Sequence, residues 1–544
     1  MDNGTTFTYR NKFGGFWVSD PANPFSNNAR PNSWTPPLNT SWTWGQDRVF
    51  GVNLGGWLVM EPFITPSYYQ KYTGAVDEFT LSTLMIADTG AGGGLQQLEA
   101  HYDTFITEQD IAEIAGAGLN WVRVPIAFWA IETWAGEPFL ARTSWKYFLR
   151  FLGWARKYGL RVCLDLHAVP GSQNGYNHSG MLKVVNFMSG NMGLANAQRT
   201  LDYIRVLTEF ITQPEYQDLI PIFGIVNEPT AGTAALSNFY LEAHNLIRNI
   251  TGLGAGHGPY IAMHSAFNGA GDWVGFLQGA DRMILDEHPY FAFGGVNTSP
   301  VNTTGATGQP GGTWPARTSF GVMIAGEFSA APNDCGLFMV GVGVVSANPQ
   351  CPEYDDWPSY SDEMKAGLLN MVLATMDALG DWFFWTWKIG PDQSGNISSP
   401  LWSYQLGLAN GWIPTDPRTA QGKCASLSVS INRFSGAFLP WQTGSTPSSI
   451  PDASSVKYPW PPATMTNADV SVSLLPTYTN TGPVITMPVP TTFTSAPSKV
   501  TSGFDGWFDQ ADTAGGVVTV AGCTYPNEYT PTFAVVPTAA CTGA

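Results

Sequence analysis

Short apolar segments alternate with amphipathic segments along most of this chain. Eight apolar segments have the continuity of buried parallel strands, and they predict strands at 48–54, 119–125, 160–167, 219–226, 260–264, 283–288, 320–327 and 381–387. Five intervening segments have apolar residues at helical spacing, which predicts helices at 105–117, 145–158, 200–210, 236–249 and 361–379. Proline is expected to stop the second strand at Pro125 and the fourth strand before Pro229.

This alternation predicts an α/β fold, a (β/α)8 TIM barrel with inserted loops, over residues 48–424. A doubly wound open sheet is the alternative, but Gly51–Gly56 is not a GxGxxG turn that opens a helix. We interpret residues 1–47 as an N-terminal extension that packs on the barrel. Residues 425–544 are expected to form a Ser/Thr/Pro-rich C-terminal extension, partly disordered and partly short strands such as 515–520. A small carbohydrate-binding module is a minor alternative for this extension.

Composition and charge narrow the range of functions. The 544 residues have a net charge of −17, which argues against a nucleic-acid partner because such partners need a basic surface. No apolar run reaches the roughly 18–20 residues of a membrane span. Aromatic residues make up 13% of the chain, with 21 tryptophans, so some can stack on a flat ligand in addition to filling the core. We expect a monomer.

Cysteines and glycosylation sequons favour an extracellular protein, secreted or cell-wall associated. The first residues have no signal-peptide pattern, which fits either a cytosolic start or a removed leader. An even number of cysteines and several Asn-x-Ser/Thr sequons favour the second case: the sequons are at Asn3, Asn39, Asn177, Asn249, Asn297, Asn302 and Asn396. Cys335 can pair with Cys351 or with Cys424, and Cys523 with Cys541. Cys163 lies in an apolar strand and is interpreted as a buried thiol.

Polar, titratable or aromatic side chains stand at nearly every predicted strand end. In (β/α)8 barrels the chemistry lies at the C-terminal ends of the strands, so these side chains would converge on one pocket. An isolated Asn227-Glu228-Pro229 could be only an acidic helix cap, but that explanation does not cover the whole set. The set is Glu61, Arg123, His167, Asn227, Glu228, His264, His288, Tyr290, Glu327 and Trp387.

Two glutamates at the ends of the fourth and seventh strands predict glycoside hydrolysis. This reaction uses one ionised carboxylate and one that keeps its proton near the working pH. Arg123 near one glutamate would keep it ionised, and the like charge would raise the pKa of the other. Three further groups would assist: Tyr290 as a donor to the nucleophile, Asn227 at a sugar 2-hydroxyl, and Trp387 as a flat platform for a sugar ring. No metal or organic cofactor is needed, and no zinc-site spacing occurs.

Four motifs resemble glycoside hydrolase family 5, and most closely its fungal exo-β-1,3-glucanases; they are 51–62, 164–175, 224–229 and 325–329. The resemblance runs from about Asn11 to Cys424. It implies a retaining double displacement with Glu228 as acid/base and Glu327 as nucleophile. It also implies a first sugar subsite formed by Arg123, His167, Asn227, His288, Tyr290 and Trp387. Glu61 would bond the terminal glucose, and Tyr176 and Phe293 would clamp the next sugar at the pocket mouth.

The chain departs from the family pattern beside Tyr176. The family has an aromatic-Asp-Asn-Ser-Gly stretch there, whereas residues 176–180 read Tyr-Asn-His-Ser-Gly, without the Asp. That loop shapes the subsites, so linkage preference stays open, and the insertion 294–317 could also reshape the pocket mouth. The secondary candidates have plainer interpretations: His264 as a core histidine bonded to a backbone carbonyl, Trp385 as barrel core, Asp165 as an orienter of His167, and Asp286 and Glu287 as solvated or paired acids.

The leading hypothesis is therefore a retaining exo-β-glucosidase that releases glucose from the non-reducing end of β-1,3-glucan. One alternative keeps the chemistry and changes the substrate to a β-1,6-glucan or a steryl or aryl β-glucoside. Another alternative is an inactive cell-wall protein that binds carbohydrate, although the presence of both glutamates argues against it.

Overall fold

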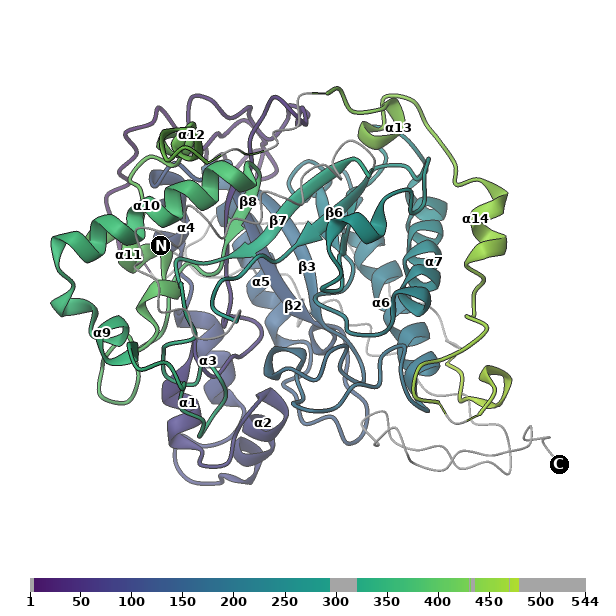
Figure 1. Cartoon of the computed structure of the whole chain (residues 1–544), viewed down its shortest axis with the longest axis horizontal. Coiled ribbons are helices and arrows are strands. Elements are labelled where there is room, and N and C mark those ends of the chain that lie inside the picture. Colours follow the sequence, from purple (N-terminus) through teal and green to yellow (C-terminus); the bar gives the residue numbers. More distant parts are fainter. Residues whose placement is uncertain (1–3, 294–319, 430, 432–435, 469, 479–544) are drawn as a thin grey trace.

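Eight parallel strands form a closed barrel in the computed structural model, which describes residues 4–293, 320–429, 431, 436–468 and 470–478 (Figure 1). Each strand pairs with its neighbours in sequence, and β1 also pairs with β8. The strands are β1 (Phe50–Asn53), β2 (Trp121–Ala127), β3 (Arg161–Ala168), β4 (Ile222–Gly224), β5 (Tyr260–His264), β6 (Met283–Glu287), β7 (Val322–Phe328) and β8 (Trp382–Phe384). The predicted (β/α)8 barrel is confirmed.

The prediction that proline stops the second strand is wrong. β2 continues through Pro125, which pairs with Asp165 of β3. On its other side, β2 pairs with β1 only as far as Arg123. Beyond that residue one edge of β2 has no strand partner, so a residue without an N–H group is tolerated there.

The five predicted helices are present with shifted ends, as α4 (Glu108–Gly116), α5 (Thr143–Tyr158), α6 (Gly193–Ile211), α7 (Thr233–Thr251) and α10 (Asp362–Leu379). Three helices between β1 and β2 were not predicted: α1 (Pro66–Lys71), α2 (Glu78–Ala87) and α3 (Gln96–Thr104). The buried face of α2 includes the polar Glu78 and Ser82, so α2 is defined more by its N-terminal capping box at Asp77 than by apolar periodicity. The other short helices are α9 (Cys351–Asp355), α11 (Tyr404–Asn410), α12 (Lys423–Ser426), α13 (Pro440–Thr443) and α14 (Asp452–Lys457).

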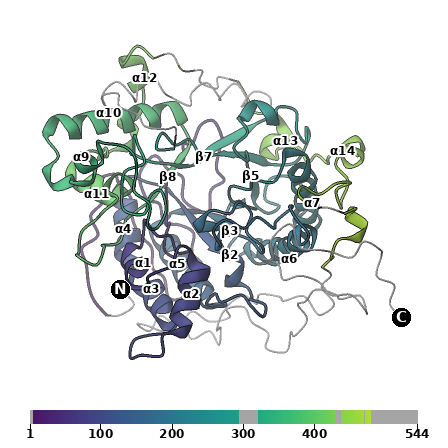
Figure 2. The same cartoon turned by 60° about the horizontal axis from the view of Figure 1, so that its bottom comes forward.

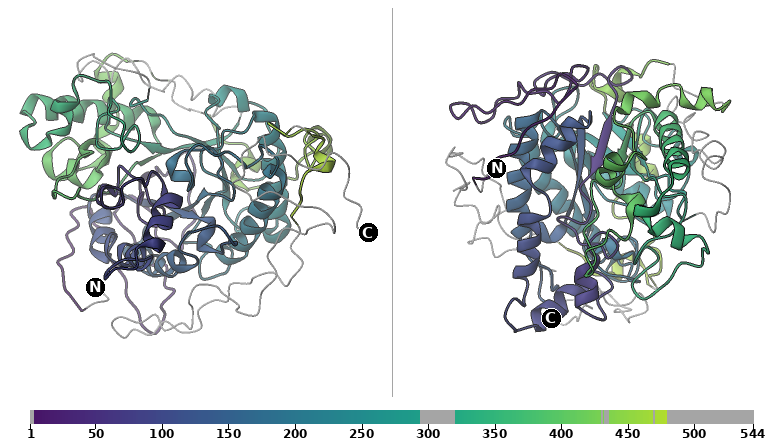
Figure 3. Two further views of the ribbon diagram at one scale, coloured as in Figure 1. Left: turned by 90° about the horizontal axis from the view of Figure 1, so that it is seen from below. Right: turned by 90° about the vertical axis from the view of Figure 1, so that its left-hand side faces the viewer.

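The N-terminal residues lie across one end of the barrel (Figure 3). Trp42 packs edge-on against Trp121 with ring centroids 5.2 Å apart, and Trp44 packs against Tyr260 at 5.5 Å. The buried Arg161 at the start of β3 donates hydrogen bonds to three main-chain carbonyls of this segment, those of Pro36, Pro37 and Thr40. This end of the barrel is therefore plugged, and the open end is the one at which the strands terminate.

The described part of the C-terminal extension, residues 436–478, runs along the outside of the barrel, with α14 beside α7 (Figure 1). Trp441 accepts a main-chain hydrogen bond from Arg282, and Trp460 packs against Phe239. These residues form helical turns and extended segments instead of the predicted short strands. The candidate strand 515–520, the pair Cys523/Cys541 and the insertion 294–317 lie outside the described residues, and the boundaries at 47 and 424 stay predictions.

The disulfide joins Cys335 to Cys351, the first of the two pairings considered. Cys163 is a buried thiol, as expected. Cys424 is also buried, and its thiol donates to the carbonyl of Ala374 at 3.2 Å. Among the described residues, no helix is both long and apolar enough to cross a membrane.

Candidate active site

Glu228 stands in the turn after β4, the strand between β3 and β5, which are both labelled in Figure 2. Its φ of 48° lies in the left-handed region, which non-glycine residues seldom adopt outside functional or tightly held positions. The turn is fixed from both sides. The N–H of Asn227 donates to the carbonyl of Leu166 at 3.2 Å, and the side-chain amide of Gln173 donates to the carbonyl of Asn227 at 2.9 Å. These two bonds fix the main chain next to Glu228.

Glu327 is held near the end of β7 by two donors. Nη1 of Arg123 donates to Oε1 at 2.8 Å, and the hydroxyl of Tyr290 donates to Oε2 at 2.8 Å. Arg123 is itself buried and also contacts Asp165 at 3.2 Å and Oδ1 of Asn227 at 2.8 Å. Glu327 therefore has a fixed orientation and a permanent positive charge beside it.

His288 brings the two glutamates together. Its Nδ1 lies 2.7 Å from Oε1 of Glu228 and 3.5 Å from Oε2 of Glu327. Nε2 lies 3.6 Å from Asp286, which also accepts the N–H of Gly326 at 2.7 Å. Burial lowers the pKa of His288, but the charges of Glu327 and Asp286 outweigh burial and raise it to about 10. The ring is therefore an imidazolium at neutral pH, and Asp286 is a paired acid.

Glu228 has a second imidazole partner that the sequence analysis did not select. Nε2 of His178 lies 3.2 Å from Oε2 of Glu228. Burial raises the pKa of Glu228, but hydrogen bonds from His178 and His288 outweigh it and bring the pKa well below its usual range. The expected upward shift of this pKa is therefore wrong, because the two imidazoles outweigh burial. The departure from the family motif at residues 176–180 was the signal that could have identified His178.

His167 is oriented for contact with a ligand. Its Nδ1 lies 2.7 Å from Asp165, as expected of an orienting acid, and the ring of Trp385 stacks on it at 5.4 Å with a 9° angle between the planes. Nε2 of His167 and Nδ2 of Asn227 are buried and have no hydrogen-bond partner among the described residues. Buried polar atoms are rarely left without a partner, so these two are suited to bond the hydroxyls of a ligand.

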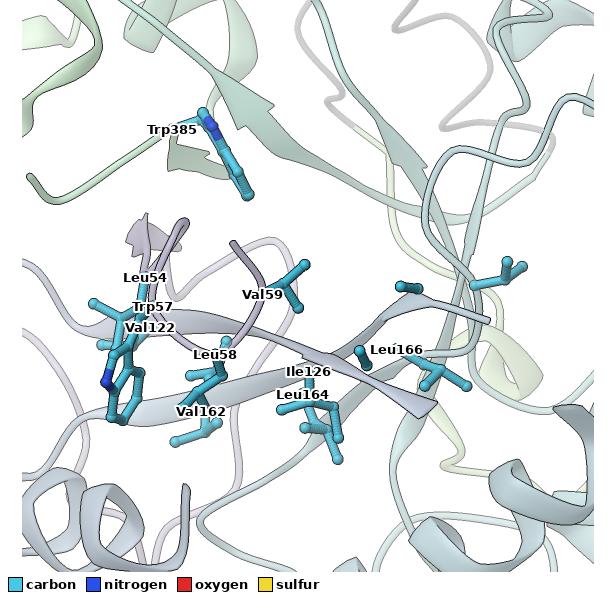
Figure 4. Packing of buried hydrophobic residues seen from close by; sticks show 14 of the residues in the cluster. Leu54, Trp57, Leu58, Val59, Val122, Ile126, Val162, Leu164, Leu166 and Trp385 are labelled. Carbon is cyan, nitrogen blue, oxygen red and sulfur yellow. The ribbon is translucent and has the colours of Figure 1, made fainter. Parts of the chain in front are cut away.

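Trp387 does not lie where the sequence analysis placed it. Its ring is fully buried, its N–H donates to Asp110 of α4 at 3.0 Å, and it stacks against Tyr404 of α11. The tryptophan beside the site is Trp385, which extends from the segment after β8 toward the interior of the barrel (Figure 4). Trp385 is buried, as expected of barrel core, and it is the ring that stacks on His167.

Glu61 is buried in the same site. Its Oε1 has no partner among the described residues, and its electrostatic neighbours include His178, Glu327 and Glu228. Burial is the largest cause that raises the pKa of Glu61 to about 8, and the two glutamates add to it. Near neutral pH Glu61 is thus a carboxylic acid, able to donate a hydrogen bond to a hydroxyl.

Exposed aromatic rings mark the mouth of the site. Tyr176 is 46% exposed and Phe293 is 60% exposed, and their clamp of the next sugar stays a prediction. Phe267, which the sequence analysis did not select, is 54% exposed and lies 6.2 Å from Tyr176. Phe293 packs against Tyr290 at 5.7 Å, so this aromatic group reaches the residue that bonds Glu327.

His264 has a backbone partner, but not the carbonyl that was expected. The N–H of Ala266 donates to its Nδ1 at 3.0 Å, so the ring hydrogen is on Nε2. Burial, with the charge of His288, lowers the pKa of His264 to about 3. Ligand atoms of Glu228, His264 and His288 lie within 4.8 Å of one another, as a metal site would require. Nδ1 of His264 is already bonded to the N–H of Ala266, and Nδ1 of His288 is bonded to Glu228, so these two nitrogens are engaged within the protein.

Comparisons with known proteins show which family this chain resembles. Residues 86–294 match the family described as Cellulase (glycosyl hydrolase family 5). The chain contains a glycosyl hydrolase family 5 domain. It is 35% identical over 464 residues to a protein of Aspergillus clavatus named "Probable glucan 1,3-beta-glucosidase D", an alignment that covers 78% of this chain and 53% of that protein. A protein of the same name from Aspergillus niger is 34% identical and aligns over 80% of this chain and 55% of its own length.

This chain spans about half the length of these curated relatives. Among solved structures, the rutinosidase from Aspergillus niger has a TM-score of 0.52 and 17% identity, covering 69% of this chain and 99% of that chain. The structure titled "Crystal structure of AoRut" has a TM-score of 0.53 and 18% identity, with the same coverage. At these identities the likeness shows the shared barrel fold alone.

Proposed function

We propose that this protein is a retaining exo-β-glucosidase, which hydrolyses β-1,3-glucan from the non-reducing end and releases glucose. One observation carries the proposal: a single nitrogen of His288 contacts both Glu228 and Glu327. The nearest oxygens of the two carboxylates are therefore no farther apart than the sum of these distances. That separation favours the roughly 5–5.5 Å spacing of retaining enzymes over the roughly 6.5–9.5 Å of inverting ones.

In the first step, Glu327 attacks the anomeric carbon while Glu228 protonates the departing glycosidic oxygen. In the second step, Glu228 removes a proton from water, and the resulting hydroxyl displaces Glu327 from the sugar. Arg123 and Tyr290 each give Glu327 a hydrogen bond that fixes its direction of attack. The buried donors and acceptors of Glu61, His167 and Asn227 would bind the hydroxyls of the terminal glucose.

The substrate class rests on the aromatic mouth and on the relatives. Tyr176 and Phe293 expose ring surface that can pack against the second sugar of a glucan, and Phe267 adds to it. The curated relatives named as probable glucan 1,3-beta-glucosidases support the β-1,3 linkage. The altered loop at residues 176–180 supports testing other linkages and aglycones alongside it.

Product analysis tests this proposal. The purified protein is incubated with laminarin, with pustulan and with nitrophenyl β-glucoside, and early products are separated by chromatography. Glucose as the sole early product from laminarin is the expected result, whereas a ladder of oligosaccharides contradicts exo action. Faster release from pustulan or from the aryl glucoside indicates the alternative substrates. If the protein binds laminarin but shows no hydrolysis that the Glu327→Gln substitution removes, the protein is an inactive binding protein.

We also propose that the protein is a monomer that works outside the cell, secreted or attached to the cell wall. The Cys335–Cys351 disulfide supports an oxidising compartment. Cell fractionation and size-exclusion chromatography with light scattering test the two parts. Activity confined to the cytosol, or a dimer at working concentration, contradicts them.

A further inference from the structure

Both oxygens of Glu228 face an imidazole. His288 takes Oε1 at 2.7 Å, and His178 takes Oε2 at 3.2 Å. The two rings differ in their other partners. His288 also faces Glu327 through the same Nδ1 and Asp286 through Nε2, so three carboxylates favour its protonated form. Among the described residues, His178 has one carboxylate within ion-pair distance, which is Glu228.

The surroundings of His178 allow its ring to gain and lose a proton. Burial lowers the pKa of His178, but the hydrogen bond and charge of Glu228 outweigh burial and leave the pKa above its ordinary value. Its Nδ1 is buried and has no partner among the described residues. The titratable groups that face the ring are Glu228, Glu61, Glu327, His167 and Tyr176.

The loop that carries His178 does not depend on the imidazole for its shape. The hydroxyl of Ser179 bonds to the hydroxyl of Ser172 at 2.6 Å, and the N–H of Gly180 donates to the carbonyl of Asn177 at 3.3 Å. The N–H of Tyr176 donates to Asn174 at 2.8 Å. Replacement of the ring therefore leaves the local backbone bonds in place.

We propose that His178 is a positioning residue that stores the transferable proton of the acid/base Glu228. This inference rests on the proposed function, because it assigns a proton source to the same glutamate. In the resting enzyme the proton is on Nε2 of His178 and Glu228 is a carboxylate. His288 keeps its own proton throughout and holds Oε1.

The proton balance closes over one turnover. The proton of Nε2 moves to Oε2 of Glu228, and the carboxyl hydrogen turns toward the glycosidic oxygen. As Glu327 bonds to the anomeric carbon, the C–O bond breaks, its electron pair goes to the leaving oxygen, and that oxygen takes the proton. In the second step Glu228 takes a proton from the attacking water and returns it to Nε2. The net change is the addition of one water molecule across the glycosidic bond.

The pH profile of His178→Gln tests the inference. Glutamine can still donate a hydrogen bond to Oε2, but it cannot store a proton. Glu228 must then hold the proton itself, while His288 still favours the carboxylate, so the proton is lost at lower pH. We expect the alkaline limb of kcat/KM for nitrophenyl β-glucoside to move by about one pH unit toward acid, which is roughly a tenfold loss on that limb.

Three comparisons decide between this role and a structural one. With dinitrophenyl β-glucoside, whose leaving group needs no proton, His178→Gln should keep kcat/KM near the wild-type value. Because His178 acts through Glu228, the double variant Glu228→Gln/His178→Gln should lose no more activity than Glu228→Gln alone. His257 is exposed, so His257→Gln is the matched control, and it should leave the pH profile of kcat/KM unchanged.

An unchanged alkaline limb in His178→Gln overturns the inference. An equal loss at every pH and on both glucosides also overturns it, because that pattern indicates a damaged pocket. If the wild-type protein itself hydrolyses none of the glucosides, the proposed function has failed instead, and the two failures are distinguished by that one assay.

Discussion

Nη1 of Arg123 lies 2.8 Å from Oε1 of Glu327, and both side chains are buried, with 2% and 6% of their surface exposed. The contact joins β2 to β7, two strands that are not neighbours in the barrel. Removing one partner of a buried ion pair leaves an uncompensated charge, which is costly. The pair therefore links the stability of the barrel to the orientation of the proposed nucleophile.

Replacement of Glu327 by glutamine should abolish hydrolysis of every glucoside, by roughly 10⁴-fold or more, because the covalent intermediate can no longer form. The variant should fold, since the glutamine carbonyl can still accept from Arg123. Initial rates on nitrophenyl β-glucoside and a circular-dichroism melt check both points. Glu287→Gln is the control: this acid of β6 accepts a hydrogen bond from Ser265, and its variant should stay active. More than a tenth of wild-type activity in Glu327→Gln excludes Glu327 as the nucleophile.

Replacement of Glu228 by glutamine should have an effect that depends on the leaving group. Substrates with poor leaving groups need the proton and should lose about 10²–10⁴-fold in kcat/KM, whereas dinitrophenyl glucoside should lose little in the first step. Azide should partly restore turnover, because it attacks the glycosyl-enzyme without a general base. The product should be the β-glycosyl azide, identified by NMR. An α-glycosyl azide from this variant reverses the assignment of the two glutamates.

Much of the fold and the pair of glutamates could be predicted from the sequence. The strands are continuous apolar runs, and the barrel topology brings their ends together, so Glu228 and Glu327 could be paired although they lie far apart in the chain. A contact of Arg123 with one glutamate was also predicted, but its contacts with Asp165 and Asn227 were not. Helices α1–α3 were not predicted; in α2, for example, the buried face includes the polar Glu78 and Ser82 while Ile86 is exposed, so the apolar positions do not follow the helical period.

The side chains beyond the regular strands were harder to place. Strand alternation puts residues 385 and 387 on one face, but β8 ends at Phe384 and its pairing with β7 is irregular between Ala325 and Phe328. The alternation therefore no longer decides which ring enters the site. His178 lies in a loop with no periodicity, so only its contact with Glu228 in three dimensions identifies it.

The two tryptophans after β8 should differ in their effect on activity. Trp385→Leu removes the ring that stacks on His167 and should lower kcat/KM by roughly 10-fold or more; because the ring is buried, it should also lower the free energy of unfolding. Trp387→Phe removes the hydrogen bond to Asp110 and core volume, so it should lower the free energy of unfolding by about 1–3 kcal/mol with near-normal kcat/KM. Urea unfolding and initial rates on both variants check this. The reverse pattern shows that Trp387 is the platform after all.

Glu78 should make the stability of the barrel depend on pH. This first residue of α2 is completely buried and accepts the N–H of Met60 at 2.7 Å. Burial is the main cause that raises the pKa of Glu78 to about 8, from 4.5. Between these values the folded protein holds a proton that the unfolded chain has released. The free energy of unfolding should therefore fall as pH rises through this window, by up to roughly 4 kcal/mol once Glu78 ionises.

Urea unfolding at pH 5, 7 and 9 measures this dependence. Glu78→Gln keeps an acceptor for Met60 but cannot ionise, so its stability should fall less than that of the wild type between pH 5 and 9, and its activity should persist. Glu61→Gln is the matched comparison, because the pKa of Glu61 is also raised to about 8 by burial. The stability of Glu61→Gln should also fall less than that of the wild type between pH 5 and 9. This variant should lose activity, however, since Glu61 lies among the catalytic groups. If the free energy of unfolding of Glu78→Gln and of the wild type falls equally with pH, Glu78 has an ordinary pKa in the folded protein.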